Sequence, residues 1–129
     1  MENQILKTEK MIFGGNCIAK IEKGENKGKA VLISGALPHE LVEVKFLNST
    51  KDYEIAEVVK IIEKSPHRIT PICSFFGECG GCNLQYATDE YQKVLRLEIL
   101  QDLFSVLENE QIKLPQIKLI SDNDWNYRN

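Results

Sequence analysis

The sequence has no apolar run long enough to cross a membrane, and its first residues, MENQILKTEK, lack the apolar core of a secretory signal. It also lacks an excess of positive charge, because the net charge at pH 7 is −3 and the isoelectric point is near 5.4. Domains that bind nucleic acid indiscriminately are usually basic, so this composition gives that class no support. Histidine is scarce, with two residues, which leaves few side chains to complete a metal site. We expect a cytoplasmic protein that does not associate with membranes.

Three of the four cysteines lie in one short segment, Cys73–Cys82, with the spacing C-x5-C-x2-C. Three glycines in this loop permit the tight turns that bring several sulfurs to one centre. Iron–sulfur clusters and structural zinc both usually take four ligands, so the spacing leaves open a cluster, a zinc ion, and a disulfide or free thiols. In a reducing compartment, clustered cysteines favour a metal over a disulfide. No fourth ligand stands at motif spacing, and the remaining candidates are Cys17, His39 and His67.

Residues 1–64 have the pattern of short strands separated by glycine-containing turns. Five short strands in so few residues predict a small barrel of the OB type, a fold that often binds oligonucleotides on one face. A β domain that serves only as a spacer is the alternative, because fold does not fix function. The expected strands are Ile5–Phe13, Cys17–Ile21, Ala30–Ile33, Val42–Phe46 and Tyr53–Ile62.

Charge is distributed unevenly along the chain. Residues 1–72 carry 11 Lys/Arg against 10 Asp/Glu, whereas residues 73–129 carry 5 against 9, so the first part is the better candidate for contact with phosphate. Lys20, Lys27 and Lys29 lie around one turn with glutamates between them. A solvated turn is the simpler interpretation of this local excess, and a phosphate-binding turn is the alternative.

Several single residues allow both a structural and a functional interpretation. Phe13 beside Gly14-Gly15 could stack on a base, but we expect it in the core. Cys17 lies in a strand pattern and should be a small buried hydrophobic residue. His39 follows a proline in a loop and should be solvated.

The second half begins with Ser65–Pro71, whose two prolines predict an extended linker. Thr88 or Asp89 should begin a helix that ends near Leu107. This helix is apolar around more than half of its circumference, which is typical of a helix buried between layers. Little else in the chain could cover it, so we expect a truncated protein whose helix packs on an absent domain or on a second copy. One further strand, Ile117–Ile120, is expected before a polar end.

Taken together, several segments resemble one family, the RNA uracil-C5-methyltransferases. The first group resembles a TRAM domain, and the second resembles the region that follows TRAM in that family. The first group is Ile12-Phe-Gly-Gly, Ile18-Ala-Lys and Leu37-Pro38-His39-Glu40; the second is Ser65-Pro66-His67-Arg68, Cys73-x5-Cys79-Gly-Gly-Cys82-Asn-Leu-Gln, Tyr91-Gln92 and Trp125–Asn129. The resemblance covers essentially the whole chain, although Cys17 and His39 stand where the family commonly has glycine.

The resemblance implies a mainly β protein with three parts. They are a TRAM barrel that binds RNA (1–64), a linker with an iron–sulfur loop (65–87), and the start of a truncated α+β central domain (88–129). It implies that Cys73, Cys79 and Cys82 hold a [4Fe-4S] cluster whose fourth ligand lies outside this chain. The candidate contacts of the barrel with RNA are Lys20, Lys27 and Lys29.

The resemblance also implies the chemistry of the whole enzyme. In the family, a C-terminal domain binds S-adenosylmethionine, and a cysteine attacks C6 of a flipped-out uridine so that C5 accepts the methyl group. We find no motif for the methyl donor, no nucleophile and no base in this sequence, so we expect the chain alone to be inactive. The prediction is the RNA-binding, cluster-bearing part of a 5-methyluridine RNA methyltransferase, with rRNA favoured over tRNA. The alternatives are a free-standing RNA-binding adaptor with a zinc-stabilised loop and a structural zinc protein that does not bind RNA.

Overall fold

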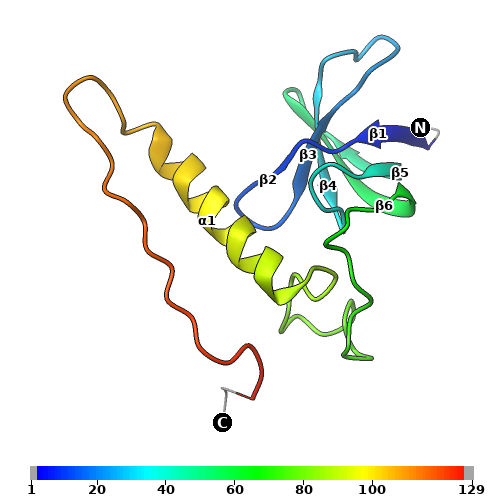
Figure 1. Cartoon of the computed structure of the whole chain (residues 1–129). Helices are drawn as coiled ribbons and strands as arrows, with labels where there is room; N and C mark the ends of the chain where they lie inside the picture. The colour runs from blue at the N-terminus through cyan, green and yellow to red at the C-terminus, as the bar shows by residue number, and fades with distance from the viewer. Residues whose placement is uncertain (1–2, 127–129) are drawn as a thin grey trace. The chain divides into compact units, whose positions relative to one another are not determined.

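The computed structural model describes residues 3–126, and the chain divides into two compact units, residues 1–68 and 69–129. The first unit is made of strands, and the second contains a single helix among its described residues (Figure 1). No helix in the described part of the chain is long and apolar enough to cross a membrane. The predicted mainly β fold is therefore confirmed.

Six strands form one mixed sheet in the first unit, and buried and exposed residues alternate along most of them. The first expected strand, Ile5–Phe13, divides into two short strands, while the other four lie where the pattern predicted them. The strands are β1 (Gln4–Lys7), β2 (Lys10–Met11), β3 (Cys17–Lys20), β4 (Ala30–Ser34), β5 (Leu41–Ser49) and β6 (Tyr53–Glu63).

The strand order is β1-β5-β6-β4-β3-β2, and only β4 and β6 pair in parallel. The two strands at the ends of this order, β1 and β2, belong to one nearly continuous segment. Between them, the Thr8 N–H donates to Glu40 O at 2.9 Å and the Glu9 N–H donates to Ile18 O at 2.8 Å. The segment thus passes from β5 to β3, which closes the sheet into a small barrel of the OB kind without a long free edge.

The interior of the barrel is filled by the inward residues of these strands, including Val31, Ile33, Val42 and Val44, all without solvent exposure. Cys17 is also completely buried, which confirms its predicted role as a small core residue. Because alternate residues of a strand face opposite sides of the sheet, the same periodicity leaves the intervening residues on the outer surface.

The second unit contains α1 (Asp89–Ser105), which begins and ends close to the predicted positions. The Thr88 hydroxyl accepts a hydrogen bond from the Tyr91 N–H at 3.3 Å and caps the helix. The expected strand over Ile117–Ile120 is wrong, because residues 106–126 contain neither helix nor strand (Figure 1). A strand needs a neighbouring edge, and this described part of the second unit supplies none.

Candidate nucleic-acid interface

The outer face of the barrel is defined by the register of β3, β4 and β6. Lys20 pairs with Ala30, which pairs with Tyr53, so these residues form one row across the three strands. Lys20 is exposed, and Tyr53 is 37% exposed at the far side of the small alanine. A cation and an aromatic ring on one side of an OB-like sheet are the groups that bind phosphate and base in single-stranded nucleic acid.

The loop between β2 and β3 adds a second aromatic ring at the other end of β3. Phe13 is 76% exposed, so the expectation that it packs in the core is wrong. The cause is the turn that follows it, in which Gly14 and Gly15 have φ of 95° and 85° and the Gly15 N–H donates to Ile12 O at 3.0 Å. The strand pattern ends before Phe13, and the tight turn places its ring in solvent, where it can stack on a base. We call Phe13, Lys20 and Tyr53 the outer-face group.

The turn between β3 and β4 carries the other predicted RNA-binding lysines. Lys27 is exposed at this turn. Lys29 is directed instead toward the β5–β6 hairpin, where its Nζ lies 2.7 Å from Glu54 Oε1 and 2.6 Å from Thr50 O. This ammonium, together with the Ser49 hydroxyl, holds the pKa of the Glu54 carboxyl below its ordinary value, although burial opposes the shift.

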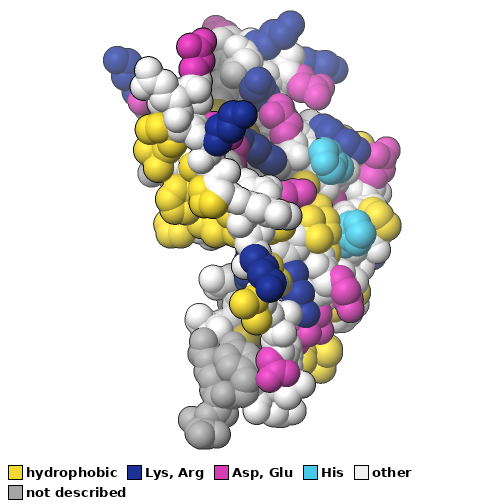
Figure 2. Space-filling view, turned by 60° about the vertical axis from the view of Figure 1, so that its left-hand side comes forward, with side chains coloured by type: hydrophobic (Ala, Val, Ile, Leu, Met, Phe, Trp, Pro, Cys, Tyr) yellow, Lys and Arg dark blue, Asp and Glu magenta, His cyan; other side chains and the backbone are white. Residues whose placement is uncertain are grey.

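The face of the molecule that is visible in Figure 2 is mixed in charge. In Figure 2, Lys/Arg and Asp/Glu side chains are interleaved on the visible face, and both histidines are at the surface. His39 is exposed, as predicted. No broad basic area is seen on the face visible in Figure 2, so a nucleic-acid interface on that face would depend on a few placed cations and aromatic rings.

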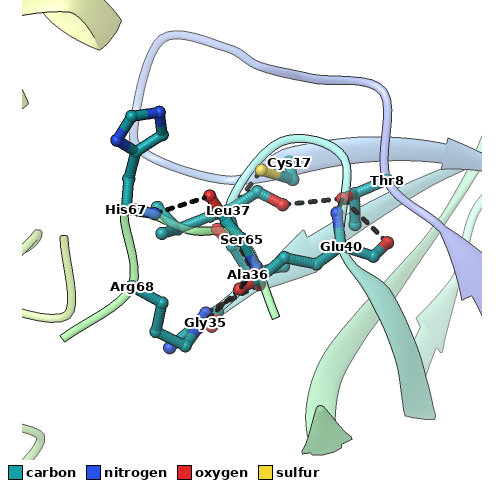
Figure 3. A network of polar contacts seen from close by, with 9 residues as sticks. All are labelled: Thr8, Cys17, Gly35, Ala36, Leu37, Glu40, Ser65, His67 and Arg68. Atoms are coloured by element: carbon teal, nitrogen blue, oxygen red, sulfur yellow. Dashed lines mark hydrogen bonds and ion pairs between the residues drawn. The ribbon is translucent and has the colours of Figure 1, made fainter. Parts of the chain in front are cut away.

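Beside the barrel core, a buried carboxylate fastens the chain segment that leaves the barrel (Figure 3). Glu40 is fully buried and accepts two hydrogen bonds from Arg68, from Nε at 2.6 Å and from Nη2 at 2.8 Å. It also accepts from the Leu37 N–H at 2.8 Å and the Ser65 N–H at 3.1 Å. The expected extended linker therefore starts with a segment, Ser65 to Arg68, that is held to the barrel through one carboxylate.

The same region fixes the loop before β5. The Thr8 hydroxyl donates to Leu37 O at 2.6 Å, and the Cys17 thiol donates to Ala36 O at 3.2 Å. Burial, together with the nearby Glu40 charge, raises the pKa of the Cys17 thiol to about 12. His39 has a φ of 65°, a left-handed conformation that favours glycine.

In the second unit, the cysteine loop is a series of tight turns. The Cys79 N–H donates to Phe75 O at 2.9 Å, and the Gly81 N–H points to Cys79 Sγ at 3.4 Å. The Cys73 N–H donates to the buried Gln85 side chain at 3.2 Å, which attaches the start of the loop to the residues before α1.

All four cysteines are free, so the disulfide alternative has no support in this structure. Cys79 and Cys82 are exposed and Cys73 is half-buried. The thiols have the right chemistry for zinc or an iron–sulfur cluster, but no three His, Cys, Asp or Glu side chains within residues 3–126 are arranged to hold a metal ion. The loop as it stands therefore does not fit such a group, and the predicted site would require the loop to rearrange.

No protein-family model matches the chain, but individual proteins do. An uncharacterised RNA methyltransferase of Treponema denticola is 39% identical, over 99% of this chain and 34% of that protein. The 23S rRNA (uracil(1939)-C(5))-methyltransferase RlmD of Shewanella amazonensis is 36% identical, over 81% of this chain and 23% of that protein. This chain is a homologue of RNA methyltransferases.

The predicted resemblance to RNA methyltransferases is therefore confirmed for the region that these proteins share. A third relative, an uncharacterised RNA methyltransferase of Aquifex aeolicus, is 33% identical over 95% of the chain and 28% of that protein. The chain spans about a third or less of the length of these methyltransferases.

The sequence alone did not identify Tyr53 as a candidate contact with RNA, and it predicted that Phe13 packs in the core. The alternation of β6 does place Tyr53 outside, because Glu54 and Ala56 are both fully buried. What the pattern could not give is the parallel pairing of β4 and β6, which puts Tyr53 in one row with Lys20.

Proposed function

We propose that this chain is the RNA-binding part of an S-adenosylmethionine-dependent RNA methyltransferase that acts on C5 of uridine in ribosomal RNA. The observation that carries this proposal is the similarity of 99% of the chain to an RNA methyltransferase. The ribosomal substrate and the position of the methyl group come from the relative named as a 23S rRNA uracil-C5-methyltransferase, which matches 81% of the chain.

The barrel supplies the RNA-binding part of this proposal, in the role that a TRAM domain would have. Its outer-face group places two aromatic rings near opposite ends of β3, with Lys20 in the same row as Tyr53 and separated from it by Ala30. Such a surface suits single-stranded RNA or a loop whose bases can be unstacked, because every base offers a face for stacking and every nucleotide offers a phosphate. Lys20 and Lys27 are the proposed phosphate contacts, whereas the ammonium of Lys29 is bound to the β5–β6 hairpin.

The test is the affinity of the chain for fluorescein-labelled single-stranded RNA at low salt. Phe13→Ala should weaken binding by about 1–3 kcal/mol, the usual value of one base–aromatic stack. Val59→Ala is the matched control, since Val59 is an exposed apolar residue of β6 outside the group, at 53% exposure. Equal affinities of the Phe13 and Val59 variants would refute this face as the interface, and no binding by the unaltered chain would refute the RNA-binding role.

We further propose that this chain alone does not transfer a methyl group. Its only core cysteine cannot be the nucleophile, because Cys17 is buried and its thiol has a raised pKa of about 12. Incubation with tritiated S-adenosylmethionine and uridine-containing RNA should leave the RNA unlabelled. Incorporation of label would contradict this part of the proposal.

For the cysteine loop, we propose that Cys73, Cys79 and Cys82 become ligands of an iron–sulfur cluster after rearrangement. The support is their free state and the exposure of two of them, together with the N–H directed at Cys79. Anaerobic incubation with iron and sulfide should give a brown protein with visible absorption, and Cys79→Ser should abolish it. Stoichiometric zinc in a colourless protein would instead favour a zinc-stabilised adaptor.

A further inference from the structure

Lys29 differs from the other lysines of the β3–β4 turn in what its ammonium contacts. Besides Glu54 and the Thr50 carbonyl, its Nζ lies 3.4 Å from the Ser49 hydroxyl. All three oxygens belong to the β5–β6 hairpin. Their residues, Ser49, Thr50 and Glu54, lie 20 to 25 positions after Lys29 in the sequence. The Lys29 side chain is only 17% exposed. Because an ammonium has three N–H donors, these three contacts use all of its hydrogen-bonding capacity.

The Glu54 carboxylate depends on this lysine. Glu54 is fully buried and accepts from Lys29 and from the Ser49 hydroxyl on one oxygen, Oε1. Its second oxygen, Oε2, has no hydrogen-bond partner among the described residues. A phosphate that drew Lys29 away would therefore leave a buried carboxylate without its counter-charge, which is strongly unfavourable.

The hairpin that Lys29 contacts has a defined shape. The Thr50 N–H donates to Tyr53 O at 2.9 Å, and the Tyr53 N–H donates to the Thr50 hydroxyl at 3.0 Å. Tyr53, at the end of this turn, belongs to the outer-face group. The lysine turn itself is closed by the Gly28 N–H to Ile21 O at 2.8 Å and by the Ile21 N–H to Lys29 O at 3.0 Å.

We propose that Lys29 is a positioning residue for RNA binding and makes no phosphate contact itself. Its ammonium joins the β3–β4 turn, which carries Lys27, to the β5–β6 hairpin, which carries Tyr53. The two loops at this end of the outer face are thereby held in one arrangement, and the aromatic ring and the cation are presented together. This inference rests on the proposed RNA-binding function and assigns a distinct role to one of its three lysines.

Salt dependence separates a positioning residue from a phosphate contact. A lysine that binds phosphate releases counterions, so its loss lowers the slope of log affinity against log salt by about 0.7 for single-stranded RNA. Lys27→Met, as the direct-contact comparison, should lower the slope by about this amount. Lys29→Met should weaken binding by roughly 2- to 30-fold, the range such indirect couplings reach, with the slope unchanged.

Glu54→Gln gives a second variant in which Lys29 remains. If Lys29 positions the hairpin, removing its partner's charge weakens RNA binding, although it removes a negative charge near the RNA. If Lys29 binds phosphate directly, Glu54→Gln frees the ammonium and leaves the affinity equal or higher. An unchanged or higher affinity, or a slope loss in Lys29→Met equal to that of Lys27→Met, would overturn the proposal.

Amide hydrogen exchange provides a readout that does not depend on RNA. In Lys29→Met, the amides of Thr50 and Tyr53 should exchange faster, while those of β3 and β5 stay protected. The double variant Lys29→Met/Glu54→Met removes the buried charge with its partner, so it should be more stable than Lys29→Met. It still lacks the ammonium that joins the loops and should not recover the affinity. Unaltered exchange in Lys29→Met would refute the link between the loops. If the unaltered chain binds no RNA while the exchange result holds, the proposed function fails and only the structural link stands.

Discussion

The clearest prediction concerns the buried pair of Arg68 and Glu40. Replacing Arg68 by methionine keeps an apolar side chain of similar length but removes both guanidinium hydrogen bonds to Glu40. It also removes the Nη2 donor to Gly35 O at 2.8 Å. The carboxylate would stay buried with only its two backbone donors, the Leu37 and Ser65 N–H groups.

The expected cost follows from this geometry. Removing one partner of a buried pair destabilises a protein by about 3–5 kcal/mol, because a charge is left uncompensated. The two remaining donors, and the 14% exposure of the Arg68 side chain, place the value near the lower limit, at about 3 kcal/mol. A loss of this size is a large part of the stability of a small domain, and it should lower the urea midpoint by about 1–3 M.

The assay is urea unfolding of the chain followed by circular dichroism, combined with amide exchange at Leu37 and Ser65. Lys7→Met is the matched control, since Lys7 pairs with Glu63 at 3.3 Å where both side chains are largely exposed, 48% and 64%. Exposed pairs contribute about 0–1 kcal/mol, so this control should be nearly neutral. Arg68→Lys should lose less stability than Arg68→Met and more than Lys7→Met, because an ammonium keeps the charge but cannot make the two parallel hydrogen bonds of a guanidinium. The reasoning is refuted if Arg68→Met unfolds like Lys7→Met, since Glu40 would then reach water at little cost.

Three other predictions address single groups. In native protein at neutral pH, Cys17 should not react with a chromogenic disulfide reagent, because its thiol is buried and its pKa is raised to about 12; Cys17→Ala should leave the native thiol count unchanged. Because Lys29 holds the pKa of Glu54 below its ordinary value, the ionised pair stabilises the fold above that value. This contribution is lost as the pH falls through the lowered pKa, so acid should destabilise Glu54→Gln less than the unaltered chain in urea unfolding. Thr88→Ala removes the hydroxyl that accepts a hydrogen bond from the Tyr91 N–H, and it should lower the free energy of unfolding by about 1 kcal/mol in the same urea measurement. Thr88→Ser keeps a hydroxyl and should retain most of this stability.

Local patterns were enough to predict most of the secondary structure. Alternation located four of the strands nearly to their ends, because a half-buried strand has a period of two residues. The hydroxyl of Thr88 predicted the start of α1, because it accepts a hydrogen bond from a first-turn N–H that has no partner within the helix. The resemblance of several short segments to RNA uracil-C5-methyltransferases agrees with the RNA methyltransferases that match the chain.

Errors arose where the outcome depended on a partner distant in the sequence. Ile117–Ile120 has the composition of a strand but no edge to pair with among the described residues of its unit. Phe13 continues the apolar pattern of the segment before it, yet the turn at Gly14 excludes it from the barrel. Periodicity describes how a side chain could be placed, but neighbouring elements decide whether anything covers it.

The sequence by itself determined most of the strands, the helix and the resemblance to RNA methyltransferases, because each depends on residues that are close together in the chain. Only the tertiary structure decided that one segment closes the barrel by pairing with both β5 and β3. It alone paired Arg68 with Glu40, 28 residues away, and Lys29 with Glu54, 25 residues away. The physical reason is that a charge can be buried only where the fold brings its partner within hydrogen-bonding distance, and no local pattern encodes that meeting.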